Sequence, residues 1–238
     1  MSDMAEIIIA LDLPTPDAAL DLVDRVGDVA SFYKLGPALY TLTGPSLIHE
    51  LRQRDKRVFL DLKFHDIPTI VASAVAAAAT LEVELLTVHA SGGSAMMRAA
   101  RAASGPDGPR ILGVTLLTSF TPGDVEEVWG KQLLSLREDV GRLANLAAEA
   151  DLHGIVTSVL EAEALRRRYG PDFLIVTPGI RPAGELAGDQ ARTATPAEAV
   201  RAGADFLVVG RPIAAAPDPA GAAARIRAEM TAALEPAG

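Results

Sequence analysis

The sequence VFLDLKFHDIPT, residues 58–69, combines a short apolar run with three charged side chains at fixed spacing. An apolar run of this kind, bounded by charged residues and proline, predicts a strand that is buried on both faces. Asp61 and Lys63 are two residues apart, so on an extended strand both would point to the same side. Asp66 follows in a turn that Pro68 closes. Charges gathered at one strand end are costly unless they pair or serve a site. The stretch therefore predicts either a structural ion pair or a functional site.

Short apolar segments recur along the chain, and each is followed by a segment with helical character. The predicted strands are residues 7–11, 32–35, 58–60, 85–89, 111–115, 154–157, 173–176 and 206–209. The predicted helices are residues 17–26, 45–54, 70–80, an Ala-rich stretch after Gly93, 136–150, 161–168, 196–202 and 220–234, with a mixed insert at 125–134. None of the strands alternates apolar with polar residues, which indicates burial on both faces.

This eightfold strand–helix alternation predicts a fold of the α/β class, the (β/α)8 or TIM barrel. An open doubly wound sheet is the alternative, but its usual glycine-rich first turn is absent. The first predicted strand runs instead into Asp12-Leu13-Pro14. No linker or change in composition divides the sequence, so we expect residues 1–238 to form a single catalytic domain.

The composition narrows the class of protein. The chain has 22 basic and 31 acidic residues, a net charge of −9, which argues against a broad nucleic-acid surface. There is no cysteine, so disulfides, thiolate catalysis and zinc–sulfur sites are excluded. No apolar run approaches the ~18 residues of a membrane span, and the acidic N-terminus does not resemble a signal peptide. We expect a cytoplasmic protein without a nucleic-acid or membrane partner.

In a (β/α)8 barrel the functional side chains gather at the carboxyl ends of the strands. The residues at or near those predicted ends are Asp12, Lys34, Asp61, Lys63, His89, Thr118, Arg181 and Arg211. The loops after the seventh and eighth strands often hold phosphate in this fold. Here they carry Gly179 with Arg181 and Gly210 with Arg211. Glycine allows close backbone approach and arginine offers a planar fork of donors, so the two loops predict a phosphate site.

The histidines and the hydroxyl residues give no clear catalytic pattern. His65 could act in catalysis or only form a hydrogen bond within its turn. His89 could line the pocket or serve in packing and loop support. These alternatives stay open for both residues. No cluster of histidine and carboxylate residues has metal-ligand spacing, so the sequence predicts no metal site. No serine or threonine near a strand end has recognisable His and Asp partners, which makes triad chemistry an unsuitable interpretation.

Over nearly its whole length the sequence resembles the orotidine 5′-phosphate decarboxylase family. The matching motifs are ALD (10–12), YKLG (33–36), DLKFHDIP (61–68), VHASGG (88–93), TLLTS (115–119), PGIRP (178–182), GDQ (188–190) and VVGRPI (208–213). The resemblance implies removal of CO2 from orotidine 5′-monophosphate (OMP) to give UMP in de novo pyrimidine synthesis. It also implies that neither a metal nor an organic cofactor takes part.

The resemblance further implies roles for individual residues. Lys63 is the proton donor to C6 of the pyrimidine, Asp61 lies beside the departing carboxylate, and Lys34 holds the charge network and reaches the ribose. Asp66, with Ile67 beside it, crosses a homodimer interface into the partner's site. The remaining roles concern substrate binding: Asp12 at the ribose hydroxyls, Thr118 near the pyrimidine, and Gln190, Gly210 and Arg211 at the phosphate. Gln190 bridges towards the base, Arg181 supports the phosphate end, and residues 178–190 are expected to act as a lid.

Two rival functions remain open at this stage. The DxKxxD element is shared with metal-dependent enzymes that act on sugar phosphates. Those enzymes would need an additional acidic ligand at the strand mouths, whereas Glu82 and Glu84 precede the fourth predicted strand. The other rival is a nucleotide-binding barrel that binds its ligand without turnover, but no element of the motif is missing from this sequence.

Overall fold

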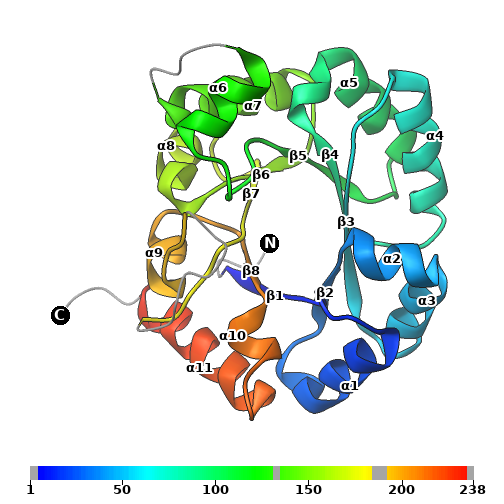
Figure 1. Ribbon diagram of the computed structural model, residues 1–238, viewed down its shortest axis with the longest axis vertical. Coiled ribbons are helices and arrows are strands. Elements are labelled where there is room, and N and C mark those ends of the chain that lie inside the picture. Colours follow the sequence, from blue (N-terminus) through cyan, green and yellow to red (C-terminus); the bar gives the residue numbers. More distant parts are fainter. Residues whose placement is uncertain (1–4, 131–134, 184–191, 235–238) are drawn as a thin grey trace.

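The computed structural model describes residues 5–130, 135–183 and 192–234, and its strands close into a parallel barrel (Figure 1). The strands are β1 (Glu6–Ala10), β2 (Phe32–Leu35), β3 (Arg57–Phe64), β4 (Leu85–His89), β5 (Arg110–Val114), β6 (Gly154–Val156), β7 (Leu174–Thr177) and β8 (Phe206–Val209). Each strand pairs with the next one in the sequence, and β8 pairs with β1 to close the ring. The predicted (β/α)8 fold is confirmed.

The helices surround the strands (Figure 1). They are α1 (Pro16–Val26), α2 (Pro37–Thr43), α3 (Ser46–Gln53), α4 (Pro68–Ala79), α5 (Gly93–Ser104), α6 (Pro122–Trp129), α7 (Leu136–Glu149), α8 (Val159–Tyr169), α9 (Pro196–Arg201), α10 (Arg211–Ala214) and α11 (Pro219–Ala232), with short 3-10 turns at Gly27–Val29 and Ala90–Gly92. Within these described parts of the chain, no helix has the length and apolar character needed to cross a membrane.

Three of these helices were not predicted as such. Proline is favoured at the first position of a helix, and α2 starts at Pro37, just after the strand predicted at residues 32–35. The insert forms α6, whose start is fixed by a capping box between Thr121 and Asp124. Arg211, predicted in a loop, is the first residue of the short helix α10. Of the mixed insert, residues 131–134 lie outside the described part of the chain.

The side chains that face into the barrel can be followed along the strands from the core to the mouth. The interior is filled by Ile8, Ala10, Phe32, Phe59, Leu85, Leu112, Leu174, Val176, Phe206 and Val208. Because side chains alternate along a strand, the residue two positions further along also faces inward. These residues are Lys34 after Phe32, Asp61 after Phe59, and Thr87 after Leu85. On β2, β3 and β4 the inward-facing side chains therefore change from apolar to polar or charged within two residues.

The amino ends of the strands carry a separate charged cluster. Arg57 donates to both carboxylate oxygens of Glu84, at 2.6 and 2.8 Å, and also contacts Glu6. Arg110 pairs with Glu84 as well, and the Arg57 guanidinium lies 4.2 Å from the centre of the Phe32 ring. Glu84 therefore forms ion pairs with two arginines at the end of the barrel opposite the mouth, as its position before the fourth strand predicted.

Candidate active site

The site begins at an irregularity in β3. The pairing of β3 with β4 is regular at Leu60, opposite Leu86, and then shifts so that Phe64 lies opposite Val88. Lys63, inside this bulge, has φ of 51°, a left-handed conformation that is uncommon for residues other than glycine. Asp61 and Lys63 lie on the same side, as predicted, with their charged groups 2.7 Å apart, but simple strand alternation is not the cause. The bulge, and not a regular strand, directs the Lys63 side chain.

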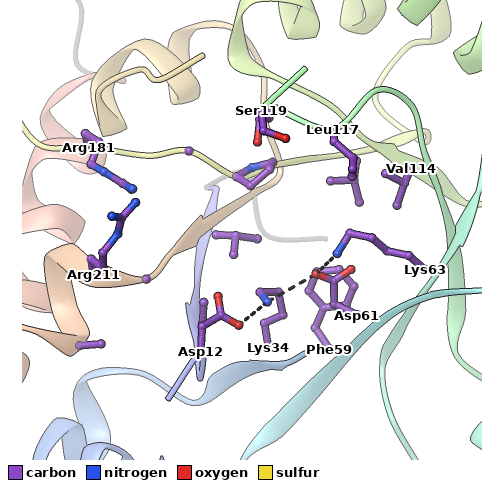
Figure 2. A pocket seen from close by; sticks show the side chains of 18 of the residues that line it. Asp12, Lys34, Phe59, Asp61, Lys63, Val114, Leu117, Ser119, Arg181 and Arg211 are labelled. Atoms are coloured by element: carbon purple, nitrogen blue, oxygen red, sulfur yellow. Dashed lines mark hydrogen bonds and ion pairs between the residues drawn. The ribbon is translucent and has the colours of Figure 1, made fainter. Parts of the chain in front are cut away.

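Four charged side chains form a continuous chain at the mouth of the barrel (Figure 2). The Lys34 ammonium lies 3.0 Å from Asp12 Oδ1 and 3.5 Å from Asp61 Oδ2. The Lys63 ammonium lies 2.7 Å from the same Asp61 oxygen. Gly36 leaves room for these charged side chains, because a Cβ atom at residue 36 would lie 3.2 Å from Asp12 Oδ1. The residues predicted from four separate motif positions thus come together in alternating charge.

Thr87 is a member of this network that the sequence analysis missed. Its hydroxyl donates to Asp61 Oδ1 at 3.0 Å and accepts from the backbone N–H of Lys63 at 2.9 Å. It therefore supports both the carboxylate and the unusual backbone that carries the lysine. The sequence offered one signal, a threonine within an apolar run (LLTV) predicted to be a buried strand. Thr87 is fully buried, and a buried hydroxyl requires a hydrogen-bond partner.

Two buried members of this network, Asp61 and Lys34, favour each other's ionised form. Burial alone would raise the pKa of Asp61, but the ammonium groups of Lys34 and Lys63 outweigh it, so the pKa lies below its ordinary value. Burial would likewise lower the pKa of Lys34, but Asp61 and Asp12 outweigh it and the pKa is raised. Only 9% of the Asp61 side chain and 11% of the Lys34 side chain are exposed, so little solvent screens their attraction.

Replacing Asp61 by asparagine should remove part of the acid sensitivity of folding. The folded-state pKa of Asp61 lies below that of the unfolded chain, so its stabilisation is present above about pH 3.9 and is lost as the pH falls towards the folded-state value. The free energy of unfolding of Asp61→Asn should therefore fall less steeply than that of the wild type between about pH 5 and pH 3. At pH 7 the variant should be less stable by about 3–5 kcal/mol, because two lysines lose their buried partner.

Urea unfolding at a series of pH values measures both effects. The matched control is Asp12→Asn, which removes the exposed partner of Lys34 and leaves the buried Asp61 in place. An unchanged slope in Asp61→Asn would contradict the assignment of the lowered pKa to this carboxylate.

A cavity of about 620 Å³ lies over the network, within the range of small-molecule sites. Its floor includes the apolar side chains of Ala10, Phe59, Val114, Val156 and Val208. The predicted site residues that line it are Asp12, Lys34, Asp61, Lys63, Thr118, Arg181, Gly210 and Arg211. Because all eight face one cavity, a single bound molecule can contact residues from most of the strand ends.

Two arginines mark the end of the cavity opposite the Asp61 network. Arg181 follows β7 and Arg211 follows β8, and Figure 2 shows their side chains pointing towards each other. Gly179 has φ of 78°, a left-handed conformation that glycine adopts without strain, so the chain turns sharply before Arg181. The backbone there is held by Ala194, whose carbonyl accepts from the Arg181 N–H at 2.9 Å. Two guanidinium groups at one end of the cavity suit a phosphate.

Two predicted site residues, Asp66 and Ile67, do not line this cavity, and a third cannot be placed. Asp66 is exposed beyond β3, where its carboxylate accepts the N–H of Ile67 at 2.6 Å. Ile67 is 62% exposed, and neither residue lines the cavity of its own chain. Gln190 lies outside the described residues, as does most of the predicted lid. Their roles stay predictions.

The two histidines whose roles the sequence leaves undecided, His65 and His89, lie together beside the network. The rings of His65 and His89 are 5.5 Å apart, and neither lines the cavity. Burial, with further contributions from His65 and Lys63, lowers the pKa of His89. His89 is therefore mostly neutral at pH 7, and its position behind Lys63 suits packing better than proton transfer to a ligand in the cavity.

The arrangement can stabilise negative charge that develops in the cavity. The Lys63 ammonium is fixed by Asp61 and is partly exposed towards the open space, so it can attract an anionic centre and donate a proton to it. In the described part of the chain, no three His, Asp or Glu side chains converge in a way that could hold a metal ion.

Comparisons with known proteins agree with this geometry. Residues 5–226 match the sequence profile described as "Orotidine 5'-phosphate decarboxylase / HUMPS family". The orotidine 5′-phosphate decarboxylase of Moorella thermoacetica is 47% identical over 232 residues, covering 94% of this chain and 92% of that protein. That of Shewanella sediminis is 46% identical over 228 residues, covering 94% and 97%.

A solved structure supports the same assignment. The crystal structure of orotidine 5′-phosphate decarboxylase from Lactobacillus acidophilus superimposes with a TM-score of 0.83 at 37% identity, covering 95% of this chain and 99% of that one. The resemblance predicted from the motifs is thereby confirmed. This chain belongs to the orotidine 5′-phosphate decarboxylase / HUMPS family.

Proposed function

We propose that this protein removes CO2 from OMP to give UMP, the last step of de novo pyrimidine synthesis, and that the whole chain acts as one catalytic domain. The observation that carries the proposal is the Asp12–Lys34–Asp61–Lys63 chain at one end of a cavity whose other end holds Arg181 and Arg211. A nucleotide has the matching layout, with the reacting base at one end and the phosphate at the other. Relatives 46–47% identical to this chain carry the name of this activity.

In the proposed reaction the C6–carboxylate bond breaks and its electron pair stays on C6, where no imine or similar electron sink is available. The Lys63 ammonium stabilises that charge as it develops and then transfers a proton to C6, which forms the new C–H bond. The neutral amine regains a proton from solvent. This sequence requires only a fixed positive charge and a proton, and we infer that no metal or organic cofactor takes part.

Asp61 has two functions in this scheme. Its carboxylate holds the Lys63 ammonium in place through an ion pair of 2.7 Å. It also stands beside the departing carboxylate, where the like charge favours departure. Lys34 compensates Asp61 from the other side and reaches towards the ribose together with Asp12.

Binding of the nucleotide is assigned to the far end and the rim of the cavity. Arg211 and Gly210 hold the phosphate with Gln190, Arg181 supports that end, and Thr118 lies near the pyrimidine. Gln190 keeps the role implied by the resemblance. Phosphate binding remote from the reacting carbon can supply free energy that is realised in the transition state.

We also infer that the working form is a homodimer with shared sites. Asp66 and Ile67 lie just beyond the strand that carries Lys63 and are exposed, so they are available to a second copy. Ile70, in the first turn of α4, is exposed beside them, which adds apolar surface for an interface. In this arrangement Asp66 of each copy completes the partner's site.

The test is the loss of ultraviolet absorbance of OMP after treatment of the protein with EDTA. Turnover that persists with the chelator supports the decarboxylase. Activity on a sugar phosphate only after Mg2+ is restored would instead support the metal-dependent rival. Tight binding of UMP without turnover of OMP would support the binding protein without catalytic activity.

A further inference from the structure

A buried ion pair lies behind the wall of the cavity and has no part in the chemistry described so far. Arg192 lies in the segment before α9, and Glu161 lies in the first turn of α8. The Arg192 Nη1 atom donates to the two Glu161 carboxylate oxygens at 3.1 and 3.3 Å. Each side chain is only 7% exposed, and neither lines the cavity.

The same guanidinium also holds the segment that follows β5. Its Nη2 atom donates to the backbone carbonyl of Leu117 at 3.1 Å and to that of Leu116 at 3.4 Å. Leu116, Leu117, Thr118 and Ser119 form one wall of the cavity. Arg192 therefore reaches this wall from behind and satisfies two of its carbonyl groups.

Two residues further along, the same segment is joined to a second wall. Ala194 donates its N–H to the Gly179 carbonyl at 3.3 Å, and its own carbonyl accepts from the Arg181 N–H at 2.9 Å. Gly179 and Arg181 line the arginine end of the cavity. Residues 192–194 thus connect the wall after β5 with the wall after β7 through hydrogen bonds on both sides.

The pair is poorly suited to a purely stabilising role. In the described part of the chain the buried Nε atom of Arg192 finds no hydrogen-bond acceptor. Burial raises the pKa of Glu161 even though Arg192 acts against it, so the attraction does not fully offset desolvation of the carboxylate. Buried ion pairs can often be replaced by apolar residues of similar volume without loss of stability. A role in geometry explains the pair better.

We propose that Arg192 is a positioning residue, which, held by Glu161, fixes the spacing between the Leu116–Ser119 wall and the Gly179–Arg181 wall. The proposal rests on the proposed nucleotide substrate, since only a ligand that touches both walls is sensitive to their spacing. A nucleotide joins base and phosphate by a ribose of fixed length. Inorganic phosphate touches the arginine end alone, so its binding is independent of the spacing.

The test compares UMP with inorganic phosphate by isothermal titration calorimetry in the double variant Arg192→Met/Glu161→Leu. We expect the Kd for UMP to rise at least about tenfold and kcat/KM for OMP to fall by up to about 10²-fold, because small displacements of bound groups have effects of that size. The Kd for phosphate and the melting temperature should match those of the wild type. The matched control is Glu163→Ala/Arg167→Ala, which removes an exposed ion pair on the same helix and should alter none of these values.

An unchanged Kd for UMP overturns the proposal, and so does an equal rise for both ligands, which would show damage to the arginine end alone. If the double variant does not fold, Arg192→Lys replaces it. This variant keeps a charge beside Glu161 but lacks the guanidinium fork that reaches the carbonyl groups. UMP should therefore bind more weakly, whereas phosphate binding should not change. Unchanged UMP binding overturns the proposal. Wild-type protein that binds UMP without turning over OMP would refute the proposed function and leave the positioning role intact.

Discussion

Replacing Lys63 by alanine is expected to lower kcat for OMP by at least about 10⁴-fold, because in the proposed reaction one side chain supplies both the proton and the charge that stabilises the carbanion. The fold should survive. The Lys63 side chain faces the cavity, and Asp61 keeps Lys34 and Thr87 as partners after the change. The left-handed backbone at this position is equally available to alanine and lysine, so the substitution adds no backbone strain.

Steady-state turnover and thermal unfolding of the same preparation separate the two effects. Lys56→Ala is the matched control, because Lys56 donates to the Gly27 carbonyl and does not line the cavity. It should keep its activity. Turnover of Lys63→Ala near the wild-type rate would refute the role of this lysine, whereas a collapse of the melting temperature would show that the side chain is needed for folding.

Mixing Lys63→Ala with Asp66→Ala, each expected to be inactive alone, is expected to restore activity. In a twofold-symmetric dimer each site would take Lys63 from one copy and Asp66 from the other. A mixed dimer then has one site with both residues and one site with neither. With random exchange at equal concentrations, half of the dimers are mixed, so activity should recover to about a quarter of the wild-type value.

The control for this experiment is a mixture of Lys63→Ala with Arg211→Ala. Both residues line the cavity of their own chain, so every site in a mixed dimer lacks one of them, and activity should not exceed that of the parents. Subunit exchange is verified with a differently tagged copy. Absence of recovery despite exchange would refute the shared site and place Asp66 in a role within its own subunit.

Much of the candidate site could be predicted from single strands and the loops that follow them. Asp12, Lys34 and Asp61 lie at or just beyond the carboxyl ends of apolar runs, and in a parallel barrel all such ends meet at one mouth. The arginines after β7 and β8 lie at one end of the cavity for the same reason. Local periodicity thus determined the fold and placed these charged residues at the cavity.

Tertiary structure alone decided how those residues are held. The left-handed Lys63 depends on a register shift against β4, and Thr87 reaches Asp61 across 26 residues of sequence. Arg192 meets Glu161 across 31 residues and the Leu117 carbonyl across 75. A buried polar group needs a partner, but the partner can come from any segment that folds against it, and residue spacing carries no record of which segment that is. The sequence by itself determined which side chains face the cavity, and long-range packing decided their orientation and partners.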